Sequence, residues 1–182
     1  MKQVISILFI SLLFGKAYSS TETVNVHDHE YPSQFEDHSV TWTLAGTHHF
    51  KYKIFFSVFT AALYQPEEGE GTSLRFTYTR KLKADDLREQ AMKTLKAQND
   101  SETLENYQTL TDEIQESYQD VKPGDAYTIT VVPEKGTWLY LNDQEVFFTE
   151  NAEFGEWYLN IWLGNPPASE DLKTALLKDS AP

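Results

Sequence analysis

The sequence predicts an α+β fold, an open-faced sandwich in which a mostly antiparallel sheet carries helices packed on one of its faces. The first observation is the order of the patterns along the chain: three strand-like segments, two helical segments, three strand-like segments and two helical segments. Strands that follow one another directly are joined by hairpins and pair antiparallel. The second observation is length, because about 160 residues remain after an apolar leader, enough for one domain with a core of its own.

The leader is Met1–Ser19. It has Lys2 near its start, an apolar run over Val4–Phe14, and the small residues Ala17 and Ser19 before the expected cleavage point. This arrangement is typical of a secretory signal peptide. The run of about 11 apolar residues is shorter than the roughly 20 that a membrane-spanning helix needs. We therefore expect an exported protein, periplasmic in a Gram-negative cell or secreted, without a membrane span once the leader is removed.

Composition narrows the classes of partner. The net charge is −13, and it becomes −15 without Lys2 and Lys16 of the leader. Such a balance argues against nucleic acid and against adsorption to anionic lipid, because both depend on cationic groups. The chain has no cysteine, so disulfides and thiolate metal sites are excluded. A small neutral, cationic or apolar ligand fits better, and a protein partner stays unknown.

The first strands follow a polar N-terminal arm, residues 20–38, which is expected to be extended or to form an edge strand. The main domain is predicted over residues 39–182. Ser39–Leu44 alternates as a half-buried strand does. Lys51–Tyr64 is a long run in which neither alternate face is polar, so it predicts one strand covered on both sides. After the acidic turn Glu67–Gly71, Ser73–Arg80 alternates again as a third strand.

Helical periodicity begins after this strand. Leu87, Ala91 and Leu95 recur at four-residue spacing behind an acidic first turn. A second helix is predicted from an N-cap at Asp100 or Ser101 to about residue 118, and the Pro-Gly-Asp segment at 123–125 ends it. Further strands are predicted over residues 127–132, 137–141 and 145–148. Two closing helices are predicted over residues 153–163 and 169–178, with Ser169 as the cap of the last one.

Four segments carry a resemblance to a known family: KYKIFFSVFTAALYQP, LRFTYTRKLKADDLREQ, GTWLYLNDQEVFF and FGEWYLNIWLGNPPASEDLKTALL. They are similar to the bacterial chalcone-isomerase-like family, and the similarity extends from about Trp42 to Leu177. The last segment is the most specific, because it combines an aromatic–Gly pair, Trp-Leu-Gly, prolines and a closing helix. The resemblance implies the chalcone-isomerase fold, with a cleft between sheet and helices that admits a small hydrophobic molecule.

The same resemblance bears on activity. In the plant enzymes of this superfamily an arginine binds the flavonoid phenolate, and a tyrosine just after the third strand assists through water. Those positions correspond to Lys51 and to a residue near Lys83. A lysine is a hydrated point charge and does not reproduce the planar fork of arginine. The sequence thus favours a protein without isomerase activity, while an isomerase acting on a chalcone-like enone and a structural or partner-binding protein stay open as alternatives.

A binding site is expected to be lined from the central strand, the first helix and the late helix. A mostly apolar cavity with a few polar anchors is the usual form of a small-molecule site. Lys51 is the candidate anchor for a carboxylate head group and the one weak catalytic candidate. The alternative interpretation is that the other residues are core. The predicted ligand-binding residues are Lys51, Val58, Phe59, Lys83, Leu87, Gln90 and Trp162.

All five histidines precede Phe50. On one extended strand His27 and His29 would face the same side, so with a carboxylate or His38 they are weak candidates for a zinc or copper site. The alternative is an exposed polar arm with incidental histidines. No cofactor is predicted. The sequence has no phosphate-binding loop that would indicate a nucleotide, and no Ser–His–Asp order that would indicate a hydrolase.

Overall fold

The computed structural model describes residues 22–53 and 56–178. The predicted signal peptide, Met1–Ser19, lies outside the described residues. A seven-stranded antiparallel sheet has the order β3-β4-β5-β6-β7-β8-β9, so every neighbour in the sheet is also a neighbour in sequence. The strands are β3 (Gln34–Asp37), β4 (Val40–Tyr52), β5 (Phe56–Pro66), β6 (Thr72–Tyr78), β7 (Ala126–Val132), β8 (Gly136–Leu141) and β9 (Gln144–Thr149).

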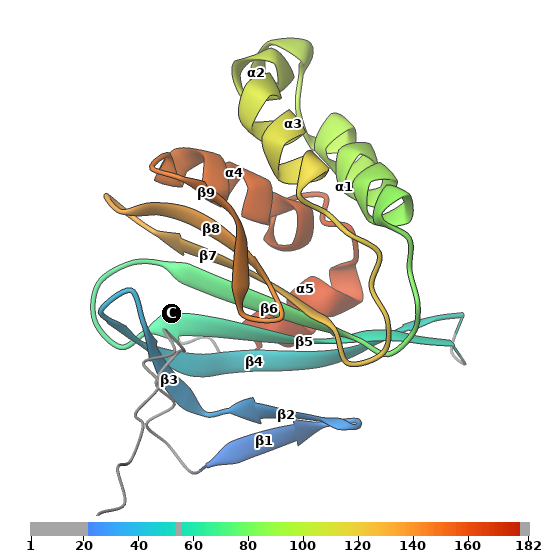
Figure 1. The fold of residues 1–182 in the computed structure, drawn as a ribbon, viewed down its shortest axis with the longest axis vertical. Coiled ribbons are helices and arrows are strands. Elements are labelled where there is room, and N and C mark those ends of the chain that lie inside the picture. Colours follow the sequence, from blue (N-terminus) through green and yellow to red (C-terminus); the bar gives the residue numbers. More distant parts are fainter. Residues whose placement is uncertain (1–21, 54–55, 179–182) are drawn as a thin grey trace, which may run out of the picture.

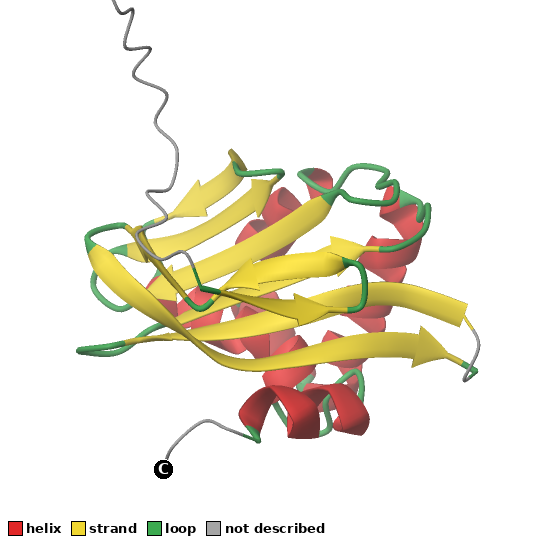
Figure 2. Cartoon of the chain, turned by 90° about the horizontal axis from the view of Figure 1, so that it is seen from below, coloured by secondary structure: helices red, strands yellow, loops and turns green. Residues whose placement is uncertain are grey.

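The helices lie together on one face of this sheet (Figure 1), and Figure 2 shows them behind the strands. On the other face lies a two-stranded hairpin of β1 (Thr23–Val26) and β2 (His29–Pro32). The predicted α+β sandwich is confirmed. No helix within the described ranges is long and apolar enough to cross a membrane. The helices are α1 (Ala84–Gln98), α2 (Ser101–Asn106), α3 (Gln108–Glu116), α4 (Ala152–Leu163) and α5 (Glu170–Leu177).

Caps fix where these helices begin. The side chain of Asp100 accepts a hydrogen bond from the backbone N–H of Thr103, and that of Ser169 accepts one from Leu172, as predicted. The single helix expected after Asp100 is wrong, because the chain forms two short helices that meet at Tyr107. The Tyr107 ring stacks on Trp157 of α4 with 4.7 Å between centroids. The helical periodicity of the segment after Asp100 therefore reflects contact with α4 and not one continuous helix.

The run Lys51–Tyr64 is not one strand. Lys51 and Tyr52 end β4, and β5 begins at Phe56, with Lys51 opposite Ser57 in the pairing. No glycine, proline or asparagine marks the turn after Tyr52, and an apolar run follows it at once, so the sequence carries no turn signal there. The prediction that the strand is covered on both sides is confirmed for Ala61–Tyr64, where every residue is buried.

Two apolar clusters explain that burial. Ala61 and Leu63 face the helices and join the larger core, which also holds Leu95. Ala62 and Tyr64 face the other way and join a smaller cluster with Trp42, under the N-terminal strands. Alternate residues of one strand thus serve two cores.

The predicted arm, residues 20–38, is largely strand. β3 pairs with β4 as the edge of the main sheet, so the edge-strand alternative describes this end of the arm. The β1–β2 hairpin is attached through Tyr31, whose hydroxyl lies 2.7 Å from Oγ1 of Thr60 and donates to Oγ1 of Thr77 at 3.0 Å. The domain boundary placed at residue 38 therefore falls inside the β3–β4 hairpin.

Candidate ligand-binding cavity

A cavity of about 500 Å³ lies between the sheet and the helices. Pockets for small organic ligands have volumes of roughly 300 to 1,000 Å³, so this one is large enough for such a molecule. Strands β4, β5 and β6 supply one wall, and α1, α4, α5 and the segments next to them supply the other. The lining residues are Phe50, Tyr52, Val58, Phe59, Phe76, Tyr78, Leu82, Asp86, Leu87, Gln90, Ala91, Lys93, Tyr118, Ile161, Trp162, Ala168, Ser169 and Leu172.

The sheet wall is aromatic. Phe59 stacks on Phe50 with 4.9 Å between ring centroids and meets Phe76 edge to face at 5.2 Å. Across the cavity, the ring of Trp162 from α4 lies 4.9 Å from that of Phe76. Phe59 and Trp162 are only half-buried although they pack against the core, because part of each ring faces the cavity. Such walls favour an apolar ligand.

Helix α1 lines the cavity with a row of polar side chains, Asp86, Gln90 and Lys93. Their spacing of four and three residues puts them on one face of the helix. All three are exposed, so this row lies at the opening rather than in the interior. Asp86 caps its own helix by accepting from the backbone N–H of Lys83 at 3.4 Å. Lys93 lies about 10 Å further along the helix, from seven residues at 1.5 Å each.

Tyrosines supply the polar groups inside. Tyr78 and Tyr118 line the cavity and are buried, and burial raises the pKa of Tyr118 to about 12 and the pKa of Tyr78 well above its ordinary value. The hydroxyl of Tyr118 lies 3.3 Å from that of Tyr158, which accepts a hydrogen bond from Nε2 of Gln115 at 2.8 Å. Both cavity tyrosines therefore stay neutral donors at physiological pH.

The comparison with known families agrees with this geometry. A family model described as chalcone isomerase-like matches residues 23–178. The chain belongs to the chalcone isomerase-like family. Among solved structures, a fatty-acid binding protein of Arabidopsis thaliana has the same fold, with a TM-score of 0.64 and 14% sequence identity over 86% of this chain and 96% of that one. No curated protein sequence matches the chain.

Five of the predicted ligand-binding residues of this chalcone isomerase-like chain line the cavity. Val58 and Phe59 come from β5, Leu87 and Gln90 from α1, and Trp162 from α4. The part of these five residues in binding stays a prediction.

Lys51 and Lys83 do not line the cavity. Lys51 is exposed near the end of β4, beyond a register irregularity between Phe50 and Lys51 in the pairing with β5. Lys83 precedes α1, and its Nζ lies 2.6 Å from Oδ2 of Asp120 with 75% of the lysine side chain exposed. The prediction for Lys51 counts back from Tyr64 along one strand, which the β4–β5 turn interrupts, whereas the prediction for Lys83 counts from Asp85–Leu87. Neither lysine is placed to hold a phenolate within the cavity.

Sequence reasoning missed several cavity residues, of which Tyr78 and Lys93 matter most. A signal for Tyr78 was present, since it ends the alternating series Leu74, Phe76, Tyr78 on the face that meets the helices. Lys93 follows Gln90 by three residues on the same helix face, so the two could have been found together.

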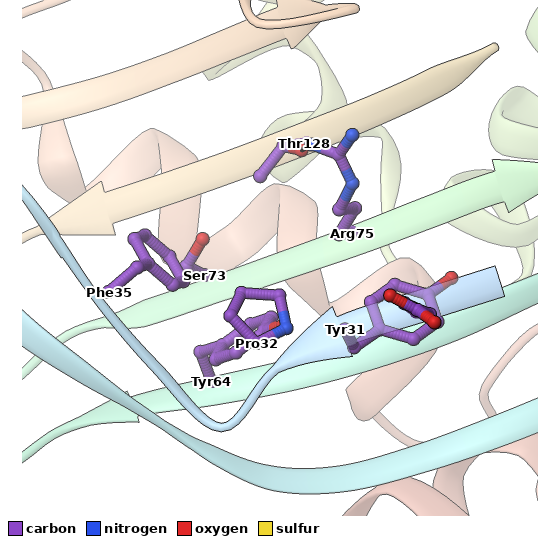
Figure 3. A pocket seen from close by; sticks show the side chains of 8 residues that line it. Tyr31, Pro32, Phe35, Tyr64, Ser73, Arg75 and Thr128 are labelled. Carbon is purple, nitrogen blue, oxygen red and sulfur yellow. Dashed lines mark hydrogen bonds between the residues drawn. The ribbon is translucent and has the colours of Figure 1, made fainter. Parts of the chain in front are cut away.

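A smaller cavity of about 150 Å³ lies on the other face of the sheet, beneath the β1–β2 hairpin (Figure 3). Tyr31 and Pro32 form one side, and Arg75 of β6 reaches it from the sheet. Nη1 of Arg75 donates to Oγ1 of Thr128 at 3.2 Å and to Oδ1 of Asp143 at 2.9 Å. Asp143 thus balances the charge of Arg75, and Glu30 adds a carboxylate to the lining, so the cavity has no excess positive charge to offer an anion.

His27 and His29 are not on one strand, because His27 lies in the β1–β2 turn and β2 begins at His29. The His27 ring stacks on that of His49 at 4.2 Å, and Nδ1 of His29 lies 3.1 Å from Oγ1 of Thr60. Within residues 22–53 and 56–178, no group of three or more histidine, aspartate or glutamate side chains is arranged to hold a metal ion. The histidines instead pack the hairpin against β4 and β5.

Proposed function

We propose that this chalcone isomerase-like protein binds a small amphipathic molecule with a fatty-acid-like tail in the sheet–helix cavity and does not catalyse isomerisation. The observation that carries the proposal is the open volume of about 500 Å³ behind a wall of Phe50, Phe59 and Phe76. Burial of an alkyl chain there is favoured by about 0.8 kcal/mol for each methylene group. A fatty-acid binding protein has the same fold, and this supports a fatty-acid-like ligand.

The distribution of polar groups favours one orientation of the ligand. A carboxylate placed inside would meet only neutral donors such as Tyr78 and Tyr118, and an ionised group without a counter-charge is costly to bury. At the opening, Lys93 offers a positive charge close to water. We therefore place the head group beside Lys93, away from the carboxylate of Asp86, with the tail directed towards the aromatic wall.

The non-catalytic part of the proposal rests on Lys51 and Lys83. Neither lines the cavity, and Lys83 is paired with Asp120 at the surface. If the protein were an isomerase, it would turn over a chalcone-like enone, and Lys51→Ala would abolish turnover while Lys96→Ala would not. We expect no turnover by any of these proteins.

The binding proposal is tested by titrating the purified protein with a fluorescent fatty acid and displacing it with an unlabelled saturated one. We expect saturable binding with one site, and displacement that weakens as the tail is shortened. A protein that gives no saturable signal with any chain length would overturn the proposal.

We further propose that the chain is exported, as a periplasmic or secreted protein. Support comes from the basic start, the apolar run and the small residues of Met1–Ser19. The intact mass of the protein isolated from its own host checks this, since export predicts a chain that begins at Ser20. A mass that still includes Met1–Ser19 would contradict it.

A further inference from the structure

Basic side chains gather at one end of the sheet. Lys51 and Lys53 lie where β4 ends, and Arg80 and Lys81 follow β6. The two groups are neighbours, because the backbone N–H of Thr79 donates to the carbonyl of Val58 at 3.0 Å and so continues the β5–β6 pairing towards this end. All four basic residues are exposed, and none of them makes an ion pair with another described residue.

Two aromatic side chains share this end. Tyr52 and Phe56 face each other across the hairpin and are 55% and 56% exposed, more than any other large hydrophobic residue in the described part of the chain. Nζ of Lys53 lies 5.3 Å from the centroid of the Tyr52 ring. Exposed aromatic rings beside lysines are typical of surfaces that contact the interface of a bilayer, where the rings sit at headgroup level and the ammonium groups meet phosphate.

The opposite end of the same strands is acidic. The β5–β6 turn carries Glu67, Glu68 and Glu70, all exposed (at the left of Figure 1, with the β4–β5 end at the right). The 11 residues of β5 separate the two ends by about 35 Å, whereas charges in physiological salt are screened over about 8 Å. The negative net charge, which argues against anionic lipid, is therefore distributed unevenly along these strands.

We propose that this end, defined by Lys51, Tyr52, Lys53, Phe56 and the Arg80–Lys81 pair, docks on anionic lipid bilayers. Tyr52 and Phe56 would enter the headgroup region, and the basic side chains would lie on the phosphates. The acidic end would then point away from the membrane. An acidic protein surface is the other occupant that the charges allow, but it does not account for two aromatic rings left this open beside the cavity.

The docking surface lies next to the cavity, so it could deliver a ligand from the bilayer. Tyr52 belongs both to this surface and to the cavity lining, and Phe50 lies just behind it. A lipid-derived ligand could pass between bilayer and cavity without crossing bulk water. This role rests on the proposed function, whereas docking itself does not.

Co-sedimentation with vesicles tests docking on the chain that begins at Ser20, because the described residues hold the whole sheet and its helices. We expect the protein to bind vesicles of phosphatidylcholine with phosphatidylglycerol, to bind vesicles of phosphatidylcholine alone far less, and to be released by high salt. The double variant Lys51→Glu/Lys53→Glu should bind the anionic vesicles at least about tenfold more weakly. Tyr52→Ser/Phe56→Ser should also weaken binding at unchanged charge.

Matched controls keep the outcome specific. Lys96→Glu changes an exposed lysine of α1, and Phe148→Ser changes an exposed aromatic of β9, both outside the docking surface. If these controls lose binding as much as the test variants, or if the wild type ignores anionic vesicles even at low salt, the proposal is wrong. Bound fatty acid measured in Lys51→Glu/Lys53→Glu separates the docking proposal from the proposed ligand binding. If this variant loses vesicle binding but still holds fatty acid, both proposals are supported. An empty cavity together with intact docking removes only the proposed function.

Discussion

The hydroxyl oxygens of Tyr118 and Tyr158 lie 3.3 Å apart, one on the cavity wall and the other fully buried behind it. Together with the amide of Gln115 they form a small polar network in an otherwise apolar layer. Burial raises the pKa of Tyr118 to about 12 and that of Tyr158 well above its ordinary value. Burial therefore keeps both rings in their neutral form.

This network predicts how stability depends on alkaline pH. In the unfolded chain a tyrosine has a pKa near 10.0, so the folded state holds protons more tightly. Stability should be unaffected by these groups below pH 10 and should fall as the pH rises from about 10 to 12, by up to about 1.4 kcal/mol per pH unit for each tyrosine. Urea unfolding at a series of pH values measures this slope. Tyr118→Phe should make it shallower, and an unchanged slope would contradict the assignment.

The head-group position can be tested on α1. Lys93→Gln removes the positive charge at the opening and should weaken fatty-acid binding by about two- to fivefold, the range for an exposed ion pair. Lys96→Gln is the matched control, an exposed lysine on the same helix that does not line the cavity. Lys51→Ala and Lys83→Ala should also leave binding unchanged. If Lys51→Ala weakened binding more than Lys93→Gln, the proposed orientation would be wrong.

Gly46 predicts a large effect on stability. Helix α5 packs so closely on β4 there that a Cβ at Gly46 would run into the backbone carbonyl of Leu176. Gly46→Ala must push α5 away from the sheet, and we expect a loss of more than about 2 kcal/mol. Thermal unfolding measures it. Thr43→Ala, an exposed change on the same strand, should stay within about 0.5 kcal/mol.

The hydroxyl of Tyr31 is one of the contacts that attach the β1–β2 hairpin to the sheet. Tyr31→Phe removes the contacts with Thr60 and Thr77 and leaves their buried hydroxyls with fewer partners. A cost of about 1 to 3 kcal/mol follows. Hydrogen exchange should speed up over residues 23–32 while β6 and β7 stay protected. Equal acceleration throughout the sheet would mean that the hairpin is not a separate unit.

Much of the fold could be predicted because its periodicities are local. The strand predicted over residues 127–132 is Ala126–Val132 in the structure, and the helix predicted over residues 169–178 is Glu170–Leu177 with Ser169 as its cap. The failure at Lys51–Tyr64 has a physical cause: the turn after Tyr52 has no glycine, proline or asparagine to mark it, and an apolar run follows at once. The position predicted for Lys51 depended on the same single strand. Tyr118 could not be assigned to the site because only the packing of the α3–β7 connection over the sheet brings it to the cavity.

The central claim is that the sheet–helix cavity holds a ligand, and native mass spectrometry of the protein purified from its own host tests it most directly. We expect a population heavier by the mass of a fatty-acid-like molecule, lost in Val58→Trp, which fills the cavity from β5, and kept in Val24→Trp, which adds the same ring to exposed β1. Circular dichroism should show both variants folded. A wild-type protein that carries no small molecule and takes none up from a fatty-acid mixture would contradict the account, as would equal loading of folded Val58→Trp.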